Sequence, residues 1–201
     1  MPVARYLVAA IAVASATAVF SSSSSSQATP PAPAPTAAPV APPPPATIDI
    51  GKVAPDFTLP WADSTGPRKA PVTLSSLKGK VVVLAFYPGD RTSGCTAELT
   101  KFRDEYSKMF GTNTVVIPIS VDSIPSHASW AQDMKFPFAL ASDTQLSVAD
   151  QYGSHNPGRT FASRTVFVIG KDGTIRWRNL KFGALNEGAY TELAAEVAKA
   201  Q

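Results

Sequence analysis

The residue of this sequence best suited to chemistry is Cys95, the only cysteine in 201 residues. A thiol has a usual pKa of about 8.5, so little of it is ionised at neutral pH, and the thiolate is the reactive form. The first turn of a helix favours the thiolate, because unpaired backbone N–H groups and the helix dipole stabilise an anion there. Gly94 and Cys95 stand at the predicted start of a helix, so the sequence predicts a nucleophilic sulfur. The alternative interpretation is a small buried hydrophobic residue.

Two elements must position this sulfur, a buried strand before it and an amphipathic helix after it. Residues 81–87 are all apolar or aromatic and rich in β-branched types, which is typical of a strand covered on both faces. Pro88 ends the strand, because proline cannot continue a central ladder. From Cys95 onward, apolar residues recur at helical steps of three and four, at Leu99, Phe102, Tyr106 and Met109.

Pro88, Thr92 and Cys95 form the pattern Pro-x-x-x-Thr-x-x-Cys, which resembles the active-site motif of peroxiredoxins. The surrounding residues are similar to the Q-type, or bacterioferritin comigratory, branch of the alkyl hydroperoxide reductase and thiol-specific antioxidant family. These residues are Phe86, Tyr87, Gly94, Thr96 and Glu98. The similarity continues in residues 54–59, 74–80, 164–169 and 171–173, so it covers the chain from about residue 50 to its C-terminus.

The resemblance implies a thioredoxin-like α/β fold, with a central mixed sheet, helices on both faces and an N-terminal β extension. It also implies a thiol-dependent peroxidase that reduces hydrogen peroxide and organic hydroperoxides without cofactor or metal. In this mechanism the Cys95 thiolate attacks the peroxide and becomes a sulfenic acid. Thr92 would hold the peroxide, and Pro88 would shield the sulfur from water. Arg164, at the start of a strand beside the strand of Cys95, matches the family's active-site arginine.

Three more residues are assigned to the substrate site by the same resemblance. The backbone N–H of Gly94 would donate to the peroxide, Tyr87 directly precedes the motif, and Glu98 matches an acidic residue of the branch. A salt-bridge partner on the helix surface is an equally good interpretation of Glu98. Arg91 is the base nearest to Cys95 in the sequence, and we interpret it as a solvated loop charge.

The sequence departs from the Q-type pattern at one informative position. Most Q-type members carry a second, resolving cysteine five residues after the first, and here that position is Thr100. Since the sequence has no other cysteine, an intramolecular disulfide cannot form. The expected partners are therefore the peroxide and an external thiol, either a thioredoxin-like protein or a small thiol, unless two chains pair through Cys95. We expect a monomer or a weak dimer.

Other functions are excluded because the sequence lacks the residues that they need. His127 and His155 are the only histidines and stand too far apart for a metal site, so we assign them surface or capping roles. A Cys-x-x-Cys oxidoreductase would need a cysteine where Thr92 stands. From residue 47 onward there are 17 Lys and Arg (all 18 but Arg5) against 15 Asp and Glu, with no cluster that would indicate a nucleic-acid partner. A non-catalytic redox sensor or interaction module, and a disulfide-exchange protein, remain as alternatives.

Residues 47–201 are predicted to form one domain, in which strands alternate with helices and an antiparallel hairpin and a helix come last. This order suggests a mixed sheet covered on both sides. Pro118, within an apolar run, suggests an edge strand or a break. Ser126 is the predicted N-cap of a helix. The other predicted strands are 57–59, 72–74, 114–121, 136–140, 165–169 and 174–179, and the helices are 126–134, 144–152 and 189–200.

The first 46 residues have a different composition. Residues 1–20 have a short basic start, an apolar stretch and small residues at a cleavage site, which predicts a secretory signal peptide, or a short membrane anchor if it is not cleaved. Residues 21–46 are a serine run followed by mostly Pro and Ala, typical of a disordered linker. We therefore expect a periplasmic or extracellular protein, with membrane contact only through an uncleaved leader.

Overall fold

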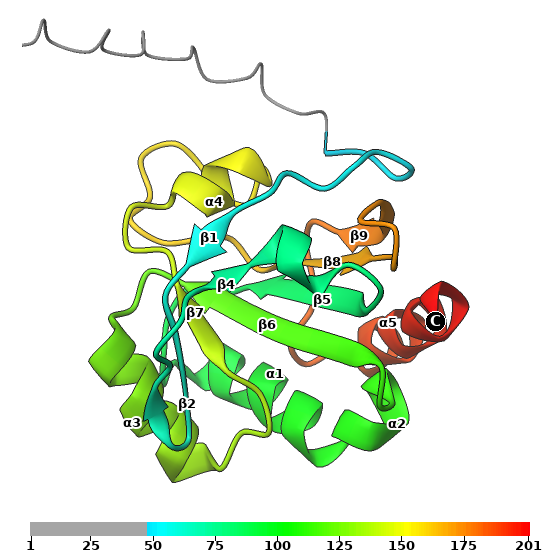
Figure 1. Cartoon of the computed structure of the whole chain (residues 1–201). Helices are drawn as coiled ribbons and strands as arrows, with labels where there is room; N and C mark the ends of the chain where they lie inside the picture. Colours follow the sequence, from blue (N-terminus) through cyan, green and yellow to red (C-terminus); the bar gives the residue numbers. More distant parts are fainter. Residues whose placement is uncertain (1–47) are drawn as a thin grey trace, which may run out of the picture. The chain divides into compact units, whose positions relative to one another are not determined.

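The computed structural model describes residues 48–201, and its centre is the strand that leads toward Cys95 (Figure 1). This strand, β5 (Val81–Phe86), is buried along its whole length. It pairs in parallel with β6 (Thr114–Ser120) and antiparallel with β8 (Thr165–Ile169). Its side chains point alternately into two buried cores, one on each face of the sheet, which explains why all six are apolar.

The main sheet has seven strands in the order β3-β2-β7-β6-β5-β8-β9. Its remaining members are β2 (Trp61–Asp63), β3 (Gly66–Pro67), β7 (Leu140–Ser142) and β9 (Ile175–Asn179). A separate antiparallel pair, β1 (Thr58–Leu59) and β4 (Val72–Thr73), precedes the 3-10 helix η1 (Leu74–Leu77). The predicted mixed sheet with an N-terminal β extension is therefore confirmed.

Two hydrophobic cores lie on opposite faces of this sheet, because successive residues of a strand point to opposite sides. Val81, Val83 and Ala85 pack with α1 (Ser93–Asp104), α2 (Tyr106–Phe110), α3 (Ile124–Met134) and α5 (Glu187–Ala200). Val82, Leu84 and Phe86 pack with α4 (Ser147–Gln151) and the β1–β4 pair. Figure 1 shows α1, α2 and α3 on one side of the sheet and α4 with β1 on the other.

The prediction for Pro118 is wrong, because β6 lies between β5 and β7 in the middle of the sheet. The carbonyl of Ile119 accepts from Tyr87 N–H, so Ile119 faces β5 and the preceding Pro118 faces β7. Pairing with β7 begins only at Ile119, opposite Ala141. The missing N–H of the proline therefore falls where no ladder bond is needed.

Several predicted boundaries also shift. Helix α3 begins at Ile124 after Ser123, with Pro125 in its first turn, so Ser126 is not the N-cap. Of the predicted strand 136–140, only Leu140 is in a strand, as the first residue of β7, and residues 136–139 form a loop. Phe136 and Phe138 of this loop stack on each other in the core, with ring centroids 5.1 Å apart. The long helix after Cys95 is divided at Glu105 into α1 and α2.

The remaining predictions are close to the structure. The strand 165–169 and the hairpin to β9 are confirmed, and α5 begins two residues before the prediction. Helix α4 is shorter than predicted, and Asp143 caps it by accepting the backbone N–H groups of Val148 and Ala149. Among residues 48–201, none of the helices has the length and apolar character that a bilayer crossing requires. The predicted leader and linker lie outside the described residues.

Candidate active site

Cys95 is the third residue of α1, in the first turn that follows the loop after β5. Its side chain is buried. The residues just before it are more open to solvent, since Thr92 and Ser93 are exposed and Gly94 is half-buried. This is the helix position where free backbone N–H groups and the helix dipole favour a negative charge.

Thr92 is the N-cap residue of α1, but its side chain does not cap the helix. The hydroxyl donates instead to the carbonyl oxygen of Gly89, at 3.1 Å. Since its hydrogen is used in this bond, the oxygen keeps its lone pairs for a second partner. Thr92 can therefore accept a hydrogen bond from a molecule that approaches the start of α1.

Arg164 reaches Cys95 from the neighbouring strand. In the β5–β8 register Phe86 lies opposite Thr165, so Arg164 is placed beside the loop that leads into α1. Its Nη2 donates to the sulfur of Cys95 at 3.3 Å, and its Nη1 donates to Oε2 of Glu98. A positive charge therefore lies directly beside the sulfur.

Glu98 lies three residues after Cys95 and is fully buried. The helix-surface interpretation of this residue is therefore wrong, although it does form an ion pair with Arg164. Burial raises the pKa of Glu98 to about 7 against the opposing effect of Arg164, and its Oε1 has no hydrogen-bond partner among residues 48–201. Burial opposes the charge on Arg164, but Glu98 and Cys95 outweigh it and raise the pKa of the guanidinium.

Gly94 has a steric role that the sequence did not indicate. A Cβ atom at this position would lie 3.1 Å from Nη2 of Arg164, so the absence of a side chain gives the guanidinium its room. Pro88 is half-buried in the loop between β5 and α1. Tyr87 is fully buried and its hydroxyl donates to Asp90 at 2.7 Å, so it supports this loop.

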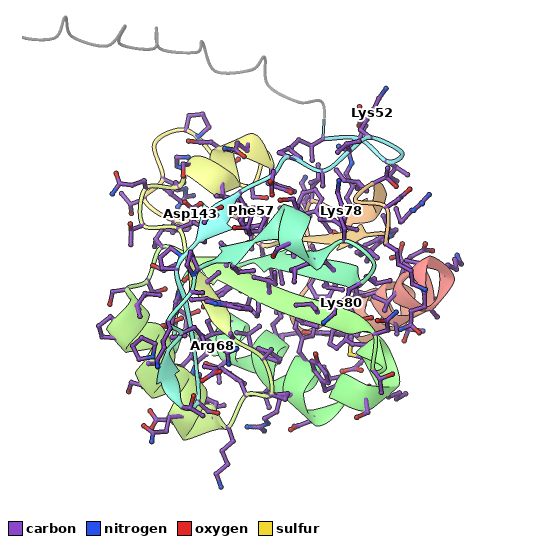
Figure 2. The ribbon with its side chains drawn as sticks, viewed as in Figure 1. Lys52, Phe57, Arg68, Lys78, Lys80 and Asp143 are labelled. Atoms are coloured by element: carbon purple, nitrogen blue, oxygen red, sulfur yellow. The ribbon has the colours of Figure 1, made fainter. Side chains whose placement is uncertain are left out.

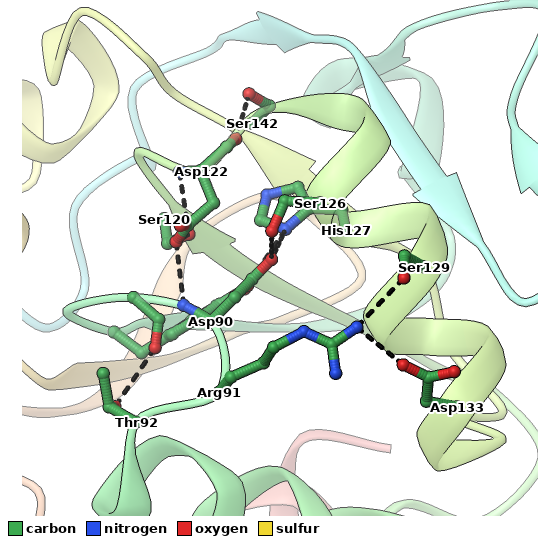
Figure 3. A network of polar contacts seen from close by, with 12 residues as sticks. Asp90, Arg91, Thr92, Ser120, Asp122, Ser126, His127, Ser129, Asp133 and Ser142 are labelled. Carbon is green, nitrogen blue, oxygen red and sulfur yellow. Dashed lines mark hydrogen bonds and ion pairs between the residues drawn. The ribbon is translucent and has the colours of Figure 1, made fainter.

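Figure 3 shows a second polar network behind this loop. His127 is fully buried, with Nδ1 3.0 Å from Oδ2 of Asp90, so the predicted surface or capping role is wrong. Sequence reasoning missed Asp90 altogether. A signal was available for His127, because it stands three and four residues before Trp130 and Ala131 and so shares their buried helix face.

The predictions for Arg91 and His155 concern charged groups nearer the surface. Arg91 is half-exposed, but it is not simply solvated, because its guanidinium contacts Asp133 at 2.6 Å and Ser129 at 3.0 Å on α3. His155 contacts Asp150 at 2.8 Å outside the site.

A cavity of about 210 Å³ lies away from this chemistry. Val82, Ile169, Lys78 and Lys80 line it, so it is at the beginning of β5, whereas Cys95 follows the end of that strand. Figure 2 shows the two lysines on one side of the domain and Asp143, which follows β7, on the other. The cavity is therefore no part of the Cys95 site.

The chain is similar to known proteins over most of this domain. The model of the AhpC/TSA family matches residues 50–178. Peroxiredoxin Bcp of Bacillus subtilis is 35% identical over 143 residues, which cover 67% of this chain and 88% of that protein. The chloroplastic peroxiredoxin Q of Sedum lineare is 39% identical over 132 residues, which cover 65% of this chain and 68% of that protein.

The fold is also similar to that of a solved protein of this kind. The crystal structure of peroxidoxin BcpB from Mycobacterium tuberculosis superposes with a TM-score of 0.64 at 30% identity, covering 76% of this chain and 97% of that one. The matched segment contains the strand, the loop and the helix that bring Cys95, Thr92 and Arg164 together. On sequence and structure alike, this chain belongs to the AhpC/TSA family.

Proposed function

We propose that the chain is a thiol-dependent peroxidase in which Cys95 is the reacting group. The observation that carries this proposal is the 3.3 Å contact between the Arg164 guanidinium and the Cys95 sulfur in the first turn of α1. A cation and a helix start acting on one thiol favour the thiolate, the form that attacks peroxides. The family relationship supports the same reaction.

The chemistry follows from the three side chains. The Cys95 thiolate attacks one peroxide oxygen, so that an S–O bond forms as the O–O bond breaks. The sulfur is oxidised to a sulfenic acid, and the departing hydroxide or alkoxide takes a proton to become water or an alcohol. Thr92 accepts the hydrogen of the bound peroxide, while Arg164 stabilises negative charge at the sulfur and on the leaving oxygen. Glu98 holds the guanidinium in place.

An external thiol must complete the cycle, because Cys95 is the only cysteine. The thiol condenses with the sulfenic acid to give a mixed disulfide and water, and a second thiol then releases reduced Cys95. Since the sulfur is buried, the first turn of α1 has to open for a thiol to reach it. A small thiol or a thioredoxin-like protein could each serve as the reductant.

The test is peroxide consumption by the native protein and by Cys95→Ser, with dithiothreitol or a thioredoxin system as the source of thiol. Catalytic consumption by the native protein and none by Cys95→Ser is the expected result. Equal consumption by the two proteins would reject the assignment. A native reaction no faster than that of free cysteine would leave only the non-catalytic module, and mixed disulfides with client proteins would favour the disulfide-exchange alternative.

We also propose that the protein is exported, with residues 1–20 as the leader and 21–46 as a linker that separates the domain from it. The proposal is supported by the composition of these two segments. Cell fractionation and N-terminal sequencing of the mature protein test it. A protein that is recovered from the cytosol with Met1 or Pro2 at its N-terminus would contradict it.

A further inference from the structure

One buried carboxylate, that of Asp90, holds the loop between β5 and α1. Its side chain is 3% exposed. It accepts hydrogen bonds from Tyr87 Oη and Ser126 Oγ, each at 2.7 Å, and from Nδ1 of His127 at 3.0 Å. The backbone N–H of Asp90 donates to Oδ2 of Asp122 at 2.8 Å, in the segment after β6. The loop is therefore fixed to α3 and to the end of β6 (Figure 3).

His127 is the least expected member of this network. Both carboxylate oxygens of Asp90 lie within 3.1 Å of Nδ1, so Nδ1 carries a hydrogen and donates it. Burial opposes ionisation of Asp90, but the hydrogen bonds from His127, Ser126 and Tyr87 outweigh it and lower the pKa of that carboxyl. The other ring nitrogen, Nε2, is buried without a partner among residues 48–201.

An unpartnered buried nitrogen costs stability, and an apolar side chain would fill this place without that cost. What histidine adds at position 127 is therefore the hydrogen bond to Asp90. The carboxylate gains in addition from its place at the first turn of α3, where a negative charge is favourable.

The loop needs such an anchor because its conformation is strained. Arg91 has φ +62°, in the left-handed region that side chains rarely adopt. Arg91 stands between Asp90 and Thr92, and the hydroxyl of Thr92 is bonded to Gly89 at 3.1 Å. If Asp90 were released, the strain would relax and the Thr92 hydroxyl would move relative to Cys95.

We propose that His127 is a positioning residue for the Cys95 reaction. By donating to Asp90 it fixes residues 89–92, and so fixes the Thr92 oxygen where the peroxide binds. It acts through the loop and not on the reacting atoms. The inference rests on the proposed peroxidase function, and it adds a fourth residue, from a different helix, to the three that act on the substrate.

The test compares His127→Leu, which cannot donate, with His127→Asn, whose amide nitrogen can take the place of Nδ1. Two rate constants of reduced Cys95 are measured in the full chain, one with hydrogen peroxide and one with iodoacetamide. Alkylation needs an accessible thiolate but not the Thr92 hydroxyl. His155→Leu is the matched control, because His155 also contacts an aspartate through Nδ1, at 2.8 Å from Asp150.

We expect His127→Leu to lower the peroxide rate at least about tenfold, or about 1.4 kcal/mol in the barrier, and the iodoacetamide rate less than about threefold. His127→Asn and His155→Leu should stay near the native values for both reagents. A native peroxide rate in His127→Leu, or an equal fall of its two rates, would overturn the inference. If that variant does not fold, Asp90→Asn replaces it with the same expected selective loss. Failure of the proposed function is recognised separately, as a slow peroxide reaction of the native protein.

Discussion

Replacing Arg164 by glutamine removes the charge beside Cys95 while keeping a polar, shorter side chain. The guanidinium Nη2 lies 3.3 Å from the sulfur, and the Arg164 side chain is only 17% exposed. At an effective dielectric constant of about 20, two unit charges at this separation attract by about 5 kcal/mol, which is an upper bound. Glu98 shares the same guanidinium, so the sulfur receives only part of this energy.

A hydrogen bond to a charged group contributes about 1.5–3 kcal/mol, and we take this as the expected loss. The rate constant of Cys95 with hydrogen peroxide at pH 7 should therefore fall by about 10-fold to about 150-fold in Arg164→Gln. Arg164→Lys should recover part of the rate, because lysine restores the charge but cannot contact Cys95 and Glu98 through two nitrogens at once.

Stopped-flow measurement under single-turnover conditions gives this rate constant directly. Arg176→Gln is the matched control, because Arg176 is a half-exposed arginine of β9 paired with Asp172. Circular dichroism confirms that each variant is folded. A peroxide rate of Arg164→Gln within about threefold of the native one would refute the reasoning, since it would limit the contribution of the guanidinium to less than about 0.7 kcal/mol.

Substitutions at three further residues probe the same site. Thr92→Val should lower the peroxide rate about 100-fold, as when a single donor or acceptor of a transition-state site is lost, and Thr92→Ser should restore most of it in the same stopped-flow assay. Gly94→Ala places a Cβ atom 3.1 Å from Arg164 Nη2, so the peroxide rate should fall several-fold. The melting temperature should stay the same or rise, because alanine favours a helix more than glycine does. An unchanged peroxide rate would show that the guanidinium has room to move. Glu98 keeps its proton in the folded state up to about pH 7, against an ordinary value of 4.5, so the native protein should lose stability as the pH rises from 4.5 to about 7. Urea unfolding should show that Glu98→Gln removes up to about 3 kcal/mol of this pH dependence, and parallel curves for the two proteins would contradict the assignment.

The arrangement of the reacting residues could largely be predicted from the sequence. The apolar run before Pro88 fixes a buried strand, the helical periodicity after Cys95 fixes a helix start, and the Asp172-Gly173 hairpin identifies the strand that begins after Arg164. These are local signals, and they specify which elements are formed. The family resemblance added the neighbour relation between the two strands.

The supporting residues could not be predicted in the same way, because their environment depends on contacts between distant segments. Glu98 has charged neighbours along the helix, and its partner in the buried site is Arg164, which lies 66 residues away and directly before β8. The helix face that His127 shares with Trp130 indicates burial, but no local pattern indicates its partner Asp90, which is 37 residues away. Pro118 is tolerated in a central strand because β7 begins to pair one residue later.

The rate at which peroxide oxidises Cys95 tests the proposed peroxidase function most directly. Reduced native protein is mixed with one equivalent of hydrogen peroxide, and the loss of the thiol and the dimedone-trapped sulfenic acid are followed by mass spectrometry. We predict that one oxygen atom is added at Cys95, at a rate orders of magnitude above that of free cysteine. Oxidation no faster than that of free cysteine, or oxygen found on methionine while Cys95 stays reduced, would contradict the central claim.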